Sequence, residues 1–140
     1  MTSALLSDLS WRKSIAQTTD QKELASYLDG GSRLLYLGFD PTAPSLHVGN
    51  LVVLTVLRRF QLAGHRPIAL VGGATGLVGD PSGRSAERTL NEMDVVADWV
   101  AKLRNQIERF LDFSGSNGAI MANNLDWTAP LSTIQFLRDI

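Results

Sequence analysis

The stretch YLGFDPTAPSLHVGN, residues 36–50, runs from an apolar strand through a turn with two prolines into the start of a helix. In α/β proteins phosphate groups bind at such turns, because the free backbone N–H groups of a helix N-terminus point at the anion. Gly49 allows close approach of the backbone, and His47, Asn50 and Thr42 add side-chain donors that can follow charge on a reacting phosphate. This stretch therefore predicts a phosphate-binding turn.

A second glycine-rich stretch, VGGATGLVGDPSGRSAERT, covers residues 71–89 and follows another apolar segment. Its glycines can be turn formers in a loop, or they can let a ligand approach the backbone, and the pattern alone favours neither. We expect a loop that lasts to about Ser85.

The rest of the chain alternates between apolar segments and amphipathic ones. We expect short strands at residues 34–38, 67–71 and 119–121, and helices at 5–15, 20–28, 50–63, 92–112 and 130–137. Strand and helix alternate after residue 33, which predicts an α/β fold with a parallel sheet and right-handed crossovers. Ligands of such sheets bind at the carboxyl ends of the strands, where both glycine-containing stretches lie.

Composition limits the possible classes of function. The chain has 140 residues, 44% hydrophobic and 19% charged, as expected for one ordinary soluble domain. It has no cysteine and two histidines, so we expect no disulfide and no protein-bound metal site. We expect a cytoplasmic protein without membrane contact, since no apolar run reaches the roughly 20 residues of a membrane span and no signal peptide is evident. A net charge of −1 gives no overall attraction to nucleic acid.

The first stretch resembles the first signature of class I aminoacyl-tRNA synthetases, His-x-Gly-His, with Asn50 in the last position. Together with Tyr36, GFDPT at 38–42 and GDPSG at 79–83, it resembles the bacterial tyrosyl-tRNA synthetase family from about residue 34 to residue 140. The resemblance implies that residues 33–140 form the first half of a Rossmann-like catalytic domain, preceded by an N-terminal helical segment at residues 1–32.

The same resemblance implies ATP-dependent activation of tyrosine to tyrosyl-adenylate and transfer of the tyrosyl group to tRNA(Tyr). ATP would be a substrate accompanied by Mg²⁺, and the full-length protein would be a homodimer. Because the tyrosine carboxylate is already a nucleophile, catalysis would rest on positioning and charge stabilisation.

Residue roles also follow from the resemblance. The catalytic group, which contacts the phosphates and ribose, would be Thr42, His47, Asn50, Arg84 and Arg88. Tyrosine would be bound by Tyr36 at its hydroxyl and Asp80 at its ammonium group, with support from Thr75 and Asn124. The adenylate would lie against Gly38, Asp40 and Gly49.

The family's second signature, a Lys-Met-Ser-Lys-Ser loop, is absent from these residues, and the chain ends within an expected helix at Ile140. We therefore expect an N-terminal fragment that is inactive alone. Two alternatives remain: an enzyme similar to tryptophanyl-tRNA synthetase, and a non-catalytic module that binds nucleotide or a partner protein.

Overall fold

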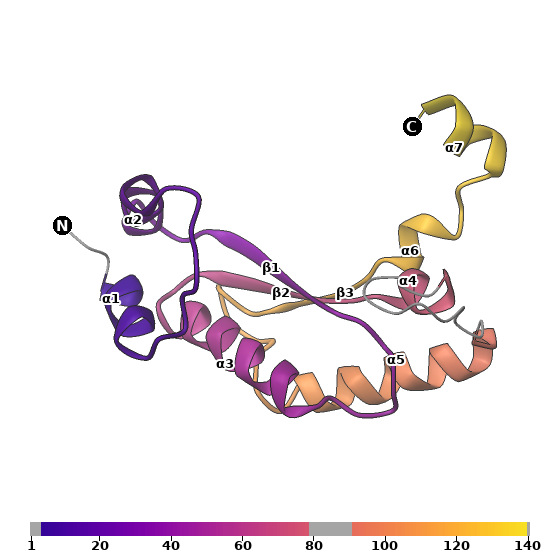
Figure 1. Cartoon of the computed structure of the whole chain (residues 1–140), viewed down its shortest axis with the longest axis horizontal. Helices are drawn as coiled ribbons and strands as arrows, with labels where there is room; N and C mark the ends of the chain where they lie inside the picture. Colours follow the sequence, from indigo (N-terminus) through magenta and orange to yellow (C-terminus); the bar gives the residue numbers. More distant parts are fainter. Residues whose placement is uncertain (1–3, 79–90, 140) are drawn as a thin grey trace.

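The computed structural model describes residues 4–78 and 91–139 of the chain. Helices and strands alternate along most of it (Figure 1), in the order α1 (Ala4–Trp11), α2 (Gln21–Asp29), β1 (Leu34–Phe39), α3 (Val48–Leu62), β2 (Arg66–Val71), α4 (Gly73–Val78), α5 (Met93–Ile107), β3 (Ile120–Asn123), α6 (Leu125–Thr128) and α7 (Thr133–Asp139). The α/β class predicted from the sequence is confirmed, and each expected strand is present within a few residues of its expected position.

The three strands form one parallel sheet in the order β1-β2-β3. Leu34 pairs with Arg66 and Phe39 with Val71 between β1 and β2, while Ile68 pairs with Ile120 between β2 and β3. Each strand adds to the same side of the previous one, and α3 and α5 lie on one face of the sheet (Figure 1). The carboxyl ends of all three strands therefore meet at one edge.

The two faces of the sheet differ in exposure. Along β1 the side chains of Leu35, Leu37 and Phe39 face α3 and α5, whereas Leu34 and Tyr36 on the other face are 58% and 70% exposed. The covered face holds the main core, made by Phe39, Leu54, Leu57, Ala69, Val71, Val96, Val100, Leu103, Ile107, Leu111 and Ala119. Burial of apolar area on this face is the principal favourable term in holding the helices to the sheet.

A second apolar cluster joins the N-terminal helices to α3. Buried leucines and an alanine of α1 and α2 pack against Val56 and Phe60 of α3. Asp20 begins α2 by accepting hydrogen bonds from the N–H groups of Lys22 and Glu23, both at 2.8 Å. The expected division of the chain into an N-terminal helical segment at residues 1–32 and part of a catalytic domain at residues 33–140 stays a prediction.

Several expected boundaries were wrong. Residues 73–78 of the expected loop form helix α4. The helix expected at 92–112 ends at Ile107, because hydrogen bonds spanning three residues, from Arg109 to Gln106 and from Phe110 to Ile107, tighten the chain into turns. The sequence pattern also missed the single helical turn α6.

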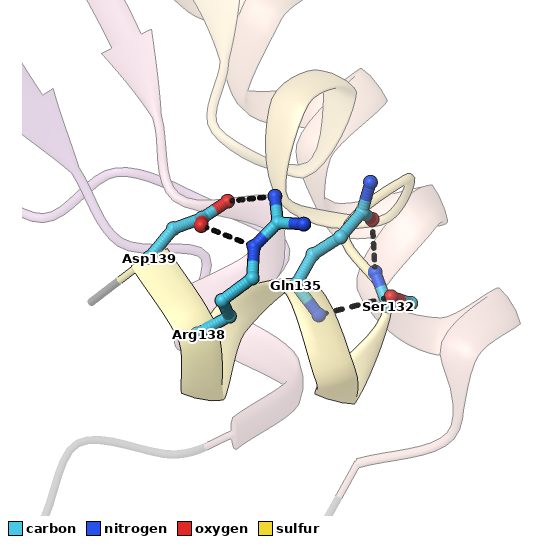
Figure 2. A network of polar contacts seen from close by, with 4 residues as sticks. All are labelled: Ser132, Gln135, Arg138 and Asp139. Atoms are coloured by element: carbon cyan, nitrogen blue, oxygen red, sulfur yellow. Dashed lines mark hydrogen bonds and ion pairs between the residues drawn. The ribbon is translucent and has the colours of Figure 1, made fainter.

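The last helix, α7, begins later than expected and extends away from the body of the structure (Figure 1). Its start is set by Ser132 and Gln135 rather than by Pro130: the Ser132 N–H donates to Gln135 Oε1 and the Gln135 N–H donates to Ser132 Oγ, each at 3.1 Å (Figure 2). Arg138 and Asp139 form an exposed ion pair at 2.7 Å on the same helix (Figure 2). Over residues 4–78 and 91–139, none of the helices is long and apolar enough to cross a membrane.

Candidate functional site

Polar residues from three segments meet at the carboxyl edge of the sheet. Asp40 follows β1, Gly72 follows β2, and Asn124 follows β3. The Gly72 N–H donates to the Phe39 carbonyl at 3.0 Å and the Asn124 N–H donates to the Val71 carbonyl at 3.1 Å, which extends the strand pairing to this edge. The segments after the strands are thus held together by the sheet itself.

Thr75 links the segments that follow β1 and β2. Its Oγ1 lies 2.9 Å from Asp40 Oδ1 and 2.9 Å from the Gly72 carbonyl oxygen. A hydroxyl has one proton to donate, so these two acceptors share it. A Cβ on Gly72 would overlap both Thr75 Oγ1 and Asp40 Oδ1, which explains why this position has no side chain.

Helix α4 is capped by side chains that are distant in sequence. The Gly73 N–H donates to Asn123 Oδ1 at 3.1 Å, and the Ala74 N–H donates to Asn124 Oδ1 at 2.7 Å. Both acceptors come from the end of β3, about fifty positions later in the chain. The predicted site residue Asn124 therefore uses its side-chain carbonyl oxygen to hold α4.

His47 and Asn50 form the first turn of α3. The His47 N–H donates to Asn50 Oδ1 at 3.1 Å, and the Asn50 N–H donates to His47 Nδ1 at 3.3 Å. Each side chain thus caps the other's backbone, in a reciprocal arrangement. Because Nδ1 accepts, the ring proton of a neutral imidazole at residue 47 lies on Nε2, which is the donor available to a ligand.

Gly49 stands beside the imidazole of His47. A Cβ built at residue 49 would lie 2.9 Å from Cε1 and 3.0 Å from Nδ1 of that ring. Glycine here makes room for the histidine, in addition to the close ligand approach that the sequence suggested.

The turn before His47 is tied to α5. Gln106 Oε1 accepts from the Leu46 N–H at 3.0 Å, and a cavity of about 440 Å³ beside this contact is lined by His47, Leu46, Leu51, Gln106, Arg109 and Phe110, together with Val48. This places one wall of the cavity on α3 and the other on the end of α5.

The remaining predicted residues lie in three places. Tyr36 and Gly38 are on the exposed face of β1, and a Cβ at Gly38 would meet no other atom within 4 Å. Thr42 is exposed in the turn, where its N–H donates to the Asp40 carbonyl at 3.0 Å. Asp80, Arg84 and Arg88 lie outside the described residues.

Sequence reasoning missed two residues of this region, Asn123 and Gln106. Two consecutive asparagines at the end of an apolar strand were a usable signal for Asn123, since short amides are favoured as helix caps. Gln106 had no such signal, because a glutamine beside a buried residue is common where the buried face of a helix meets its exposed face.

The other histidine, His65, lies at the opposite end of the sheet, where the strands have their amino ends. His65 is buried, and its Nδ1 accepts from the Arg33 N–H at 3.2 Å. Burial, with a smaller contribution from the charge of Arg33, lowers the pKa of His65 from its ordinary value of 6.5. His65 therefore joins the amino ends of β1 and β2 and takes no part in the carboxyl-edge site.

Comparison with known proteins identifies bacterial tyrosine–tRNA ligases as similar to this chain. The chain is 60% identical over 137 residues to the tyrosine–tRNA ligase of Bacillus velezensis, covering 97% of the chain and 32% of that protein. It is 57% identical over 144 residues to the tyrosine–tRNA ligase of Mycobacterium leprae, covering 100% of the chain and 34% of that protein. The chain thus spans about a third of the length of the curated relatives it matches.

A solved structure agrees with the fold. The C-terminally truncated mitochondrial tyrosyl-tRNA synthetase of Aspergillus nidulans superposes with a TM-score of 0.71 at 29% identity, covering 86% of this chain and 37% of that one. Residues 30–140 match the family described as tRNA synthetases class I (W and Y), which includes every described residue of the carboxyl-edge site. The chain belongs to this family of class I tRNA synthetases.

Proposed function

We propose that the intact protein activates tyrosine with ATP and transfers the tyrosyl group to tRNA(Tyr), with residues 36–124 of this chain supplying part of the active site. The observation that carries the proposal is the reciprocal cap between His47 and Asn50, which presents a helix N-terminus and an imidazole donor just after β1. Identities of 57–60% to proteins named tyrosine–tRNA ligase support the choice of tyrosine over tryptophan.

In the proposed first step, a carboxylate oxygen of tyrosine attacks the α-phosphorus of ATP. A new P–O bond forms, the bond from the α-phosphorus to the bridging oxygen breaks, and the electron pair leaves with pyrophosphate. Thr42 and the Nε2–H of His47 would donate to the departing pyrophosphate, where negative charge increases. Such donors act most strongly in the transition state, so they raise the rate rather than the affinity.

The nucleoside would lie along the start of α3. Gly49 and the amide NH₂ of Asn50 would contact ribose and adenine, because the carbonyl oxygen of Asn50 is already engaged with the His47 N–H. Gly38 and Asp40 would line the adenylate, with Thr75 holding the Asp40 carboxylate at 2.9 Å.

Tyrosine recognition would use residues on both sides of β1's carboxyl end. The hydroxyl of Tyr36 would bind the substrate phenol, and its 70% exposure leaves it accessible. Asp80 would bind the ammonium group, supported by Thr75 and Asn124. Arg84 and Arg88 would reach the phosphates.

Mg²⁺ would arrive with ATP rather than reside in the protein. Within residues 4–78 and 91–139, no three metal-ligating side chains come together, so these residues offer no cage for the ion. A cytoplasmic homodimer that binds tRNA(Tyr) completes the proposal.

The test is exchange of labelled pyrophosphate into ATP by the purified intact protein, with tyrosine, tryptophan or phenylalanine as the amino acid. Exchange that depends on tyrosine supports the proposal. Exchange with tryptophan would replace it by the tryptophanyl activity, and nucleotide binding without any exchange would indicate a binding module.

A further inference from the structure

Gln106 makes three hydrogen bonds to the turn that leads into His47. Its Oε1 accepts from the Leu46 N–H at 3.0 Å, and it lies 3.3 Å from the Ser45 hydroxyl, whose one proton it shares with the Leu46 carbonyl at 3.1 Å. Its Nε2 donates to the Pro44 carbonyl at 3.4 Å. These contacts join positions that are 60 to 62 residues apart in the chain. One side chain of α5 thus holds three consecutive residues of the turn.

The turn has few other polar contacts of its own. Within the described residues, Gln106 is the group outside the turn that forms hydrogen bonds with Pro44, Ser45 and Leu46. The side chain of Leu46 packs against the main core. This packing fixes how deeply the side chain is inserted, but it does not fix the orientation of the Leu46 peptide group. The hydrogen bonds of Gln106 supply that missing constraint, because hydrogen bonds are directional and apolar packing is not.

The chemistry of the contact requires a primary amide on a side chain of this length. Its oxygen accepts two donors and its nitrogen donates to a carbonyl, so all three contacts use the groups that only an amide carries together. A carboxylate would keep the two acceptor contacts and place negative charge against the Pro44 carbonyl. A leucine would keep the volume and lose all three.

The structure assigns to Gln106 the role of a positioning residue: by holding Pro44–Leu46 it sets where the first turn of α3, and with it the imidazole of His47, stands at the phosphate site. The inference rests on the proposed function of His47. Gln106 acts through the peptide of Leu46, which is bonded directly to His47, and both residues border the same cavity. Displacement of a reacting group by about 1 Å can cost up to a hundredfold in rate.

The experiment measures the rate constant for adenylate formation and the dissociation constant for tyrosine in the intact protein. We expect Gln106→Leu to lower the rate about tenfold and Gln106→Glu about threefold, while tyrosine binding changes less than about twofold. The matched control is Asn105→Asp, at an exposed amide one position earlier on α5, which should leave the rate unchanged.

A double-mutant cycle separates positioning from a general structural role. In a His47→Ala background, Gln106→Leu should cost less than about twofold, because the group that it positions is absent. A full tenfold loss in that background, a matching loss of tyrosine affinity, or no loss in the single variant would each overturn the inference. If His47→Ala by itself leaves the rate intact, the proposed phosphate contact fails and the role of Gln106 fails with it. The milder Gln106→Glu variant, with its melting temperature measured alongside, replaces Gln106→Leu in the cycle if the latter does not fold.

Discussion

His47 and Asn50 exchange two hydrogen bonds across the first turn of α3, each side chain accepting from the backbone N–H of the other. Asn50 stands where the signature of the class has a histidine, and its oxygen is committed to this cap. Among the described residues the cap engages neither His47 Nε2 nor the Asn50 NH₂, and these are the donors that the proposed nucleotide contact would use. In the proposed function the same two side chains both cap the helix and contact the ligand, and variants can separate the two roles.

Replacement of His47 should distinguish its two roles. Asparagine is a good N-cap, so His47→Asn should keep the helix start but lose the imidazole, lowering adenylate formation by on the order of a hundredfold, about 3 kcal/mol. His47→Ala should lose the cap as well and destabilise the fold by about 1 kcal/mol more. Stopped-flow rates and urea unfolding check both values. An unchanged rate with weakened tyrosine binding would contradict the phosphate role.

Gly49→Ala should reduce activity without reducing stability in proportion. The added Cβ would lie 2.9 Å from Cε1 of His47, so the ring must turn away from its present position. We expect adenylate formation to fall by about tenfold. Alanine in place of glycine within a helix itself favours the fold by roughly 0.5–1 kcal/mol, which offsets part of the lost cap. A Gly49→Ala variant with a normal rate of adenylate formation would show that catalysis does not depend on the present position of the His47 ring. The control is Leu62→Ala, at a position that is 70% exposed at the far end of the same helix, which should leave the rate unchanged.

The hydroxyl of Tyr36 should contribute to discrimination between tyrosine and phenylalanine. Tyr36→Phe should reduce the preference for tyrosine by about tenfold, since a site made to bind a hydroxyl disfavours an analogue that lacks one. The chain has one other tyrosine, Tyr27 on α2, whose ring centroid lies 4.2 Å from the Arg33 guanidinium. Tyr27 takes no part in the proposed tyrosine site. Tyr27→Phe is therefore the matched control. Equal preference ratios in both variants would return Tyr36 to a purely structural role.

The stability of the fold should depend on pH through His65. Its pKa in the folded protein lies below the ordinary value of 6.5, so the unfolded chain takes up a proton first as the pH falls. The contribution of His65 is therefore fully present above about pH 7 and decreases below pH 6.5, until the pH reaches the lowered pKa. Urea unfolding at several pH values between 5 and 8 measures this slope. His65→Gln, which keeps an acceptor for the Arg33 N–H, should flatten it, and a wild-type slope in that variant would show that another group is responsible.

The open face of the sheet should make the 140-residue chain associate when it is purified alone. Leu34 is 58% and Tyr36 70% exposed there, and parallel sheets are normally covered on both faces. We expect concentration-dependent sedimentation and binding of a hydrophobic dye. Leu34→Lys should reduce both, whereas Leu62→Lys, a change at a comparably exposed leucine at the end of α3, should have less effect. If the purified chain is a monomer and binds no dye, the uncovered face of the sheet does not cause association, and the prediction is wrong.

Local patterns were sufficient to predict the strands and the long helices. Leu34–Phe39 and Arg66–Val71 are short apolar runs next to glycines, and the apolar stripe of α5 repeats at the helical period. The cap at Asp20 is a local feature of the same kind, because it depends on one residue type at one position. Positions 80, 84 and 88 stay predictions, because they lie outside the described residues.

By itself, the sequence determined the α/β alternation and the positions of Thr42, His47, Asn50 and Thr75 after the strands, because periodicity and chain order are local properties. Tertiary structure alone decided that α4 replaces part of a loop, since its first N–H groups are satisfied by Asn123 and Asn124 about fifty residues later. It also decided that Gln106 holds the turn before His47, across 60 residues of chain. These hydrogen bonds form between groups that only the packed sheet and helices bring together, so no local pattern encodes them.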